Sequence, residues 1–190
     1  MTLGPRFIEA LIYAVQLHAG QLRRLRGVPY VAHLLAVASI ALDYGSNEDE
    51  TIAALLHDAI EDQGGPTTGD EIRRRFGPNV AAIVEGCSDS HTTPKAPWHE
   101  RKDAFLARLP DASSSVRLVV AADTLHNLRS LIRDYRRAGS AIWEHFHGGG
   151  TGTLWYYRRV VEALKQTDVS PLIDEVDRTV GELTRLARPS

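Results

Sequence analysis

Apolar residues recur along this chain at intervals of three and four, which is the spacing of amphipathic helices. The first such run lies between Pro5 and Gly20, and a second follows Pro29, which occupies the place of a first-turn proline. A third run follows Asn47, a suitable N-cap with three acidic residues directly after it. The same pattern predicts helices over residues 70–76, 80–87, 98–109, 116–137, 141–146, 153–164 and 172–186.

Two segments lack this pattern and are predicted to be loops. Residues 88–97 contain two prolines, two serines and two threonines, and the glycine-rich run 148–153 matches no phosphate-binding P-loop.

The helix after Asn47 is predicted to continue to Gly64-Gly65. Residues 116–122 carry three valines and could form a buried strand, but their apolar spacing continues at helical intervals, which favours a helix. We therefore expect an all-α bundle of about eight to ten helices.

Composition narrows the class of protein. The chain has 190 residues, 43% of them hydrophobic, which fits one domain with a proper core. Its 22 basic and 24 acidic residues give a net charge of −2, which argues against a general nucleic-acid binder. Its one cysteine, Cys87, excludes an internal disulfide, and no apolar run reaches the length of a membrane span. We expect a cytoplasmic protein with neither nucleic-acid nor membrane partners.

The segment His57-Asp58-Ala59-Ile60-Glu61-Asp62 carries the strongest chemical signal. A His-Asp pair alone is common, but two further acids at fixed positions make a chance occurrence rare. On a helix, His57 and Glu61 would be i,i+4 neighbours, as would Asp58 and Asp62, so that one face would present an imidazole and three carboxylates. Such groups resist ionisation together unless a cation lies among them. The alternative interpretation is an acidic, solvated helix face.

Two more segments offer the remaining ligands of a metal site. His33 lies in the preceding predicted helix, and Asp123 lies four residues before Asn127 in a later one. With His57 and Asp58, they would make a set of two histidines and two aspartates, which suits Mn²⁺, Fe²⁺ or Zn²⁺. Water at the open positions would become a nucleophile through its lowered pKa.

With these residues in view, the sequence resembles the HD-domain phosphohydrolases, and within them the RelA/SpoT-type hydrolases that include stand-alone small alarmone hydrolases. The matching segments are residues 18–21, 27–33, 55–62 and 122–129. The resemblance implies a single HD hydrolase domain over residues 1–190, with its motifs within about 10–165 and a C-terminal helix at about 171–188. No room is left for a synthetase domain.

The resemblance also implies an activity and a set of roles. The expected reaction is metal-dependent removal of the 3′-pyrophosphate from (p)ppGpp, with one divalent cation per chain, usually Mn²⁺. The implied metal ligands are His33, His57, Asp58 and Asp123, the implied catalytic residues are Glu61 and Asp62, and the implied substrate contacts are Arg23, Arg24, Asn127 and Ser130. In the family Asn127 matches a sugar contact and Ser130 a position near the base, whereas either Arg23 or Arg24 could take the place of the family's arginine.

The sequence leaves some alternatives open. The same chemistry could act on an adenine alarmone of the ppApp type or on the 2′-phosphate of NADPH, and a third hypothesis is a non-catalytic nucleotide-binding protein. Lys95, Trp98, Arg101 and Lys102 could cover the site, and Tyr156 or Tyr157 could stack on a base. The expected partner is a small nucleotide polyphosphate, and a homo-oligomer is compatible with the sequence.

Overall fold

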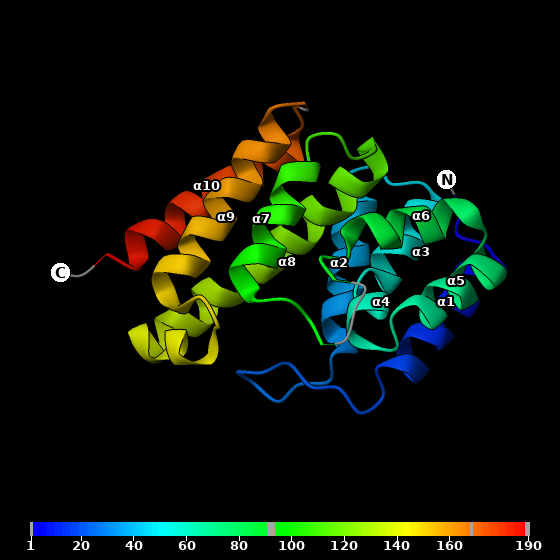
Figure 1. Ribbon diagram of the computed structural model, residues 1–190, viewed down its shortest axis with the longest axis horizontal. Helices are drawn as coiled ribbons and strands as arrows, with labels where there is room; N and C mark the ends of the chain where they lie inside the picture. The colour runs from blue at the N-terminus through cyan, green and yellow to red at the C-terminus, as the bar shows by residue number, and fades with distance from the viewer. Residues whose placement is uncertain (1, 91–93, 168, 189–190) are drawn as a thin grey trace.

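The computed structural model of the protein describes residues 2–90, 94–167 and 169–188 (Figure 1). Within these ranges the chain forms α-helices and one 3₁₀-helix, with no extended strand, so the all-α prediction is confirmed. The elements are α1 (Pro5–Leu17), α2 (Val31–Asp43), α3 (Glu48–Leu56), α4 (Ala59–Asp62), α5 (Pro66–Phe76), α6 (Pro78–Cys87), α7 (Trp98–Arg108), α8 (Ser114–Ala138), η1 (Gly139–His145), α9 (Gly149–Lys165) and α10 (Pro171–Leu186).

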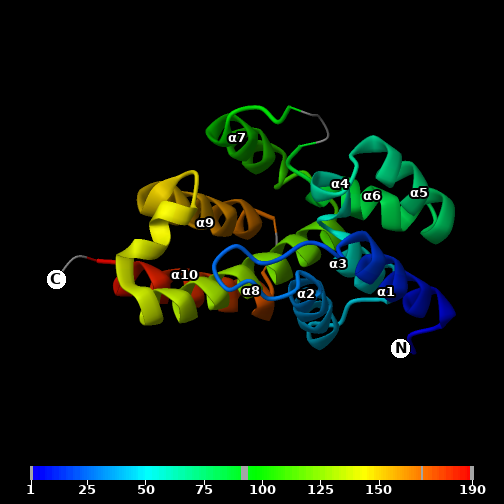
Figure 2. The same ribbon diagram turned by 90° about the horizontal axis from the view of Figure 1, so that it is seen from below.

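The long helix α8 runs through the middle of the molecule and organises the core. Its first half packs against α2, α3 and α6, and its second half lies along α10, as the two ribbon views show (Figures 1 and 2). Leu125 and Leu128 of α8 are fully buried, as are Leu34 of α2 and Leu55 of α3. Burying a leucine side chain stabilises a fold by about 1.5–3 kcal/mol, so this shared core fixes α2, α3 and α8 relative to one another.

Helix α3 begins as predicted but ends earlier. Asn47 caps it through a capping box, in which its Oδ1 accepts from the Glu50 N–H at 3.0 Å and Glu50 Oε2 accepts from the Asn47 N–H at 2.8 Å. The prediction of one helix to Gly64-Gly65 is wrong, because α3 ends at Leu56 and α4 restarts at Ala59. The His57 ring places Nδ1 2.8 Å from the Ala54 carbonyl oxygen, which a continuous helix would use for the N–H of residue 58.

The glycine-rich run also differs from its prediction. Gly149 starts α9, so residues 149–153 form the first turns of a helix and not a loop. A Cβ at Gly148 would lie 2.8 Å from Cη2 of Trp98, and one at Gly150 would lie 2.9 Å from Cδ1 of Trp143. The glycines thus let two indole rings pack closely against the start of α9.

The remaining boundaries agree within a few residues. Helix α5 begins at Pro66, four residues before its predicted start, and α6 begins at Pro78. In the predicted loop 88–97, residues 91–93 lie outside the described residues, and the rest of it is not helical. None of the helices in the described part of the chain has the length and apolar character that a membrane crossing requires.

Candidate active site

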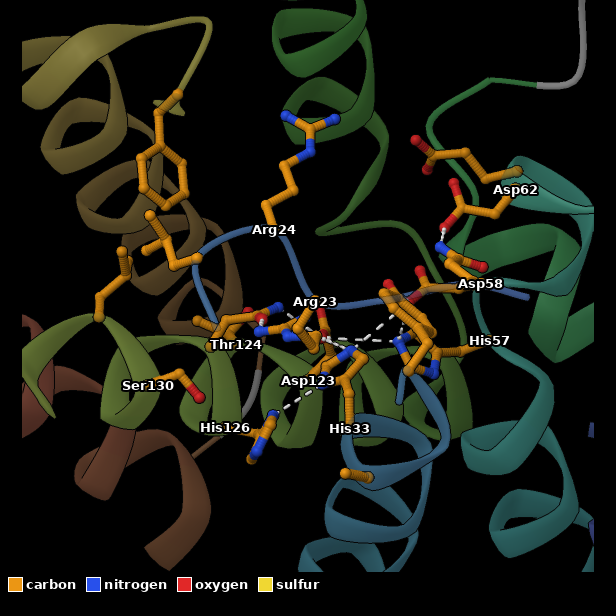
Figure 3. Close-up of a pocket in the computed structure, with 18 of the residues that line it drawn as sticks. Arg23, Arg24, His33, His57, Asp58, Asp62, Asp123, Thr124, His126 and Ser130 are labelled. Carbon is orange, nitrogen blue, oxygen red and sulfur yellow. Dashed lines mark hydrogen bonds and ion pairs between the residues drawn. The ribbon is translucent and has the colours of Figure 1, made fainter. Parts of the chain in front are cut away.

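Four side-chain atoms from three separate parts of the chain converge at one point (Figure 3). His33 comes from α2, Asp123 from α8, and His57 and Asp58 from the turn between α3 and α4. The Nε2 atom of His33 lies 3.4 Å from Asp58 Oδ2 and 3.2 Å from Asp123 Oδ1. The Nε2 atom of His57 lies 3.0 Å and 3.5 Å from the same two oxygens. The turn between α3 and α4 directs two consecutive side chains toward the same point.

The geometry and chemistry of this group fit a divalent cation. The ligand atoms of His33, His57 and Asp58 all lie within 4.8 Å of one another, and Asp123 Oδ1 adds a fourth donor beside them. The Nε2 atom of His57 is buried and makes no well-aligned hydrogen bond, although carboxylate oxygens lie 3.0 and 3.5 Å away, an arrangement that suits a ligand bound between them. Two imidazole nitrogens with carboxylate oxygens suit Mn²⁺, Fe²⁺ or Zn²⁺.

The histidines and aspartates of this group strongly affect one another's pKa values. Burial disfavours the charged form of His57, but Asp58 and Asp123 outweigh it and hold the pKa of His57 well above its usual value. Burial likewise opposes ionisation of Asp58 and Asp123, and the two histidines nevertheless lower the pKa of both carboxyls. A cation at this point would replace the imidazolium proton as the partner of the two carboxylates.

A second layer of residues orients the four side chains. The His57 Nδ1–H donates to the Ala54 carbonyl, which leaves Nε2 free to ligate. The Tyr30 hydroxyl donates to Asp58 Oδ2 at 2.6 Å, and His33 Nδ1 lies 2.7 Å from Nδ1 of His126. Neither Tyr30 nor His126 was predicted from the sequence to have a role, although both lie within the segments that carry the family resemblance.

His126 has the properties of an acceptor for His33. Burial, followed by the nearby His33 and Arg23, lowers the pKa of His126 to about 4, so its ring is neutral near pH 7. A neutral ring can accept at Nδ1 from the Nδ1–H of His33. That assignment places the lone pair of His33 on Nε2, where the site needs it.

Glu61 and Asp62 lie beside this centre on the short helix α4. Because the chain turns at residues 57–58, the predicted single helix face does not exist, and the two acids reach the site from a separate element. Lys95 Nζ lies 2.9 Å from Glu61 Oε1, and Gln21 Nε2 donates to Asp62 Oδ2 at 2.8 Å. Burial and the charge of Asp89 raise the pKa of Glu61, whereas Asp62 is exposed.

The four expected substrate contacts lie along one side of the centre. Arg23 donates to Asn127 Oδ1 at 2.8 Å, and the Asn127 amide donates to Asp123 Oδ1 at 2.6 Å. Arg24 is exposed and points away from the histidines and aspartates (Figure 3). Ser130 is buried on the same face of α8 as Asp123 and Asn127, further along the helix, and accepts from Arg133 at 3.3 Å.

The four converging residues, the two acids and the four expected substrate contacts line one cavity of about 690 Å³. Its other walls are aromatic and cationic, and come from the loop before α2, from α7, α8 and α9, and from the residue after η1. They include Arg26, Lys102, Phe105, Arg133, Phe146, Tyr156 and Tyr157. Lys102 Nζ lies 4.6 Å from the centroid of the Tyr156 ring, a cation–π contact. The cavity therefore combines a metal-binding centre, two acids and positive charge in a volume that holds a nucleotide.

Comparison with known proteins identifies the family. A family model described as an HD domain matches residues 10–153. Over 168 residues the chain is 34% identical to the guanosine-3′,5′-bis(diphosphate) 3′-pyrophosphohydrolase MESH1 of Danio rerio, with 86% of each protein covered. It is 38% identical to the Homo sapiens protein of the same name over 133 residues, which cover 68% of this chain and 72% of that protein.

The fold agrees with this relationship. A solved structure described as a metazoan orthologue of SpoT that hydrolyses ppGpp and plays a role in starvation responses matches with a TM-score of 0.76 and 25% identity, covering 96% of this chain and 97% of the other. The chain therefore belongs to the HD-domain family and is a metal-dependent phosphohydrolase of the RelA/SpoT type.

Proposed function

We propose that this protein is a cytoplasmic, Mn²⁺-dependent hydrolase that removes the 3′-pyrophosphate from (p)ppGpp. The observation that carries the proposal is the convergence of His33, His57, Asp58 and Asp123 beside the acids Glu61 and Asp62 in one cavity. The activity for which the MESH1 relatives are named supports the choice of substrate. When bound, the cation supplies Lewis-acid activation of the phosphoryl group and of the attacking water.

The surroundings of the two acids support different roles for them. Asp62 is exposed and accepts a hydrogen bond from the neutral amide of Gln21, so its carboxylate is suited to take a proton from the attacking water. Glu61 retains its proton to a higher pH than usual, because burial and Asp89 raise its pKa. Glu61 is therefore suited to protonate the ribose O3′ as its bond to phosphorus breaks, and the proton balance closes between the two acids.

Positive side chains provide the complement to a polyphosphate. Arg23 is held at the site by Asn127, Lys95 by Glu61, and Lys102 lies against Tyr156. Charge-assisted contacts of this kind bind phosphate strongly. Tyr156 and Tyr157 from α9 offer aromatic faces for the base at the other wall of the cavity.

The test is release of pyrophosphate from ppGpp by purified, Mn²⁺-loaded protein, with GDP as the second product. Glu61→Gln and Asp62→Asn are expected to abolish turnover while retaining metal, because neither side chain is in the ligand set. A His57→Ala/Asp58→Ala double variant is expected to lose both metal and turnover. Asp70→Asn, an exposed carboxylate on α5, serves as the matched control and keeps wild-type activity.

A substrate panel separates the alternatives. The proposal predicts pyrophosphate from ppGpp at a kcat/KM well above that for ppApp, and little phosphate from NADPH. A clear preference for ppApp or NADPH would refute the substrate assignment but keep the chemistry. Tight ppGpp binding without any product after prolonged incubation would instead indicate a nucleotide-binding protein.

A further inference from the structure

A second charged cluster lies next to the candidate active site, and the mechanism above gives its central carboxylate no role beyond raising the pKa of Glu61. Its centre is Asp89, two residues beyond the end of α6, whose side chain is only 3% exposed. Two cations of α7 pair with it: Arg101 through Nη1, and Lys102 through Nζ at 2.7 Å. A buried carboxylate without such partners would be strongly destabilising, so Asp89 and the start of α7 are bound to each other.

Helix α7 is also joined to the end of α6 at its last turn, where Arg108 donates to the carbonyl oxygens of Gly86 and Ser88. Figure 2 shows it standing apart from α4, α5 and α6, and its packing is against α9, where Trp98 covers Gly148 and Gly152. The ion pairs to Asp89 are therefore a main connection between α7 and the α4–α6 side of the cavity. A change at Asp89 would act first on the placement of α7.

The same cluster touches Glu61. Lys95 lies three residues before α7, and its Nζ is 2.9 Å from Glu61 Oε1. Arg101 Nη1 lies 3.6 Å from the same oxygen and also pairs with Asp89. Glu61 and Asp89 are close enough for each to shift the pKa of the other. Without Asp89, Arg101 and Lys102 would have Glu61 as the nearest remaining carboxylate of the cluster.

We propose that Asp89 is a positioning residue of the active site: by pairing with Arg101 and Lys102 it fixes α7 over the cavity and keeps both cations from capturing Glu61. Glu61 then remains free to move its proton, with Lys95 as its nearest cation at 2.9 Å and Arg101 held back at 3.6 Å by Asp89. Asp89 acts through other residues, because its side chain is almost fully buried and paired with Arg101 and Lys102. The kinetic part of this proposal rests on the proposed function, whereas the placement of α7 does not.

The test compares Asp89→Asn with Asp103→Asn, an exposed acid on α7 that receives the same chemical change. Hydrogen exchange of residues 98–108 in the substrate-free protein is expected to become faster in Asp89→Asn and to stay at the wild-type rate in Asp103→Asn. In Asp89→Asn we expect kcat for ppGpp to fall about 100-fold, the scale of a misplaced catalytic group, with KM changed less and Mn²⁺ content unchanged. Asp89→Glu retains the charge and is expected to restore much of both properties.

Each result decides the proposal. Wild-type exchange and wild-type kcat in Asp89→Asn would overturn it, and so would a loss of Mn²⁺ that explains the whole loss of turnover. If wild-type protein hydrolyses no nucleotide, the proposed function fails, and the exchange rates alone still decide whether Asp89 fixes α7. If Asp89→Asn does not fold, an Arg101→Gln/Lys102→Gln double variant removes both partners on α7, and unchanged exchange in that folded variant would refute the proposal.

Discussion

Replacing Gly148 by alanine tests how α7 is held against α9. Gly148 has a φ of −85°, which alanine adopts without strain, so the substitution adds one methyl group and no backbone cost. That methyl carbon would lie 2.8 Å from Cη2 and 2.9 Å from Cζ3 of Trp98, closer than carbon atoms approach without displacement. Trp98 opens α7, so relief of the contact has to move the indole and the first turn of that helix.

The expected magnitude follows from two opposing terms. Overpacking a fitted contact costs about 1–3 kcal/mol. Replacing glycine stiffens the unfolded chain and returns about 0.4–1 kcal/mol. The midpoints of the two ranges leave a net loss of about 1.3 kcal/mol, which corresponds to a fall in Tm of about 3–5 °C for a chain of this size. Because Lys95 and Arg101 contact Glu61 from the same segment, kcat for the hydrolysis should fall as well.

Gly152 provides the matched comparison on the same face of α9. A Cβ there would lie 3.4 Å from Trp98 Cζ3, an ordinary van der Waals distance, so Gly152→Ala is expected to raise Tm by about 1–4 °C and to leave kcat unchanged. Thermal unfolding followed by circular dichroism, together with pyrophosphate release, measures both variants. A Gly148→Ala protein with wild-type or higher Tm and wild-type kcat would refute the reasoning.

Three further outcomes are expected. In chelator-treated protein, the contribution of His57 to stability is full below its unfolded pKa of 6.5 and is lost as pH rises through its raised folded pKa. The contribution of Asp58 is full above its unfolded pKa of 3.8 and is lost as pH falls through its lowered folded pKa. The Tm relative to a His57→Gln variant should therefore be highest between pH 3.8 and 6.5, and a steady rise up to pH 9 would contradict the interaction between His57 and Asp58. Tyr30→Phe removes the hydrogen bond to Asp58 and should weaken Mn²⁺ binding about 10-fold or more in a metal titration, and an unchanged Kd would show that Tyr30 does not orient the ligand. Arg23→Ala should raise KM about 10-fold while Arg24→Ala changes it little, and steady-state kinetics giving the opposite order would reassign the phosphate contact.

The sequence predicted the helices well where packing and local signals agree. The N-cap at Asn47 and the apolar stripe of α8 are both local patterns, and the structure confirms both. The convergence of His33, His57, Asp58 and Asp123 was anticipated from residue type and family resemblance, not from periodicity. The role of each residue in turnover stays a prediction.

The features that the sequence did not predict depend on contacts between distant segments. The turn at His57 and Asp58 contains no glycine or proline from which it could be predicted. It lies where the His57 side chain donates a hydrogen bond to the Ala54 carbonyl oxygen. The glycines of residues 148–152 suggest a loop from composition, yet they are helical because Trp98 and Trp143 pack against them. Asp89 carries no local signal at all, since only the position of α7 gives it partners.

The spread of the candidate ligands along the chain has a consequence for folding. His33, the pair His57-Asp58 and Asp123 belong to segments that meet only after α2, α3 and α8 have packed together. A bound cation would close two long loops of the chain, as a cross-link does, and so would disfavour every conformation in which those helices have separated. Metal occupancy would then report the assembly of the core, and partial opening of any one of the three helices would release the cation.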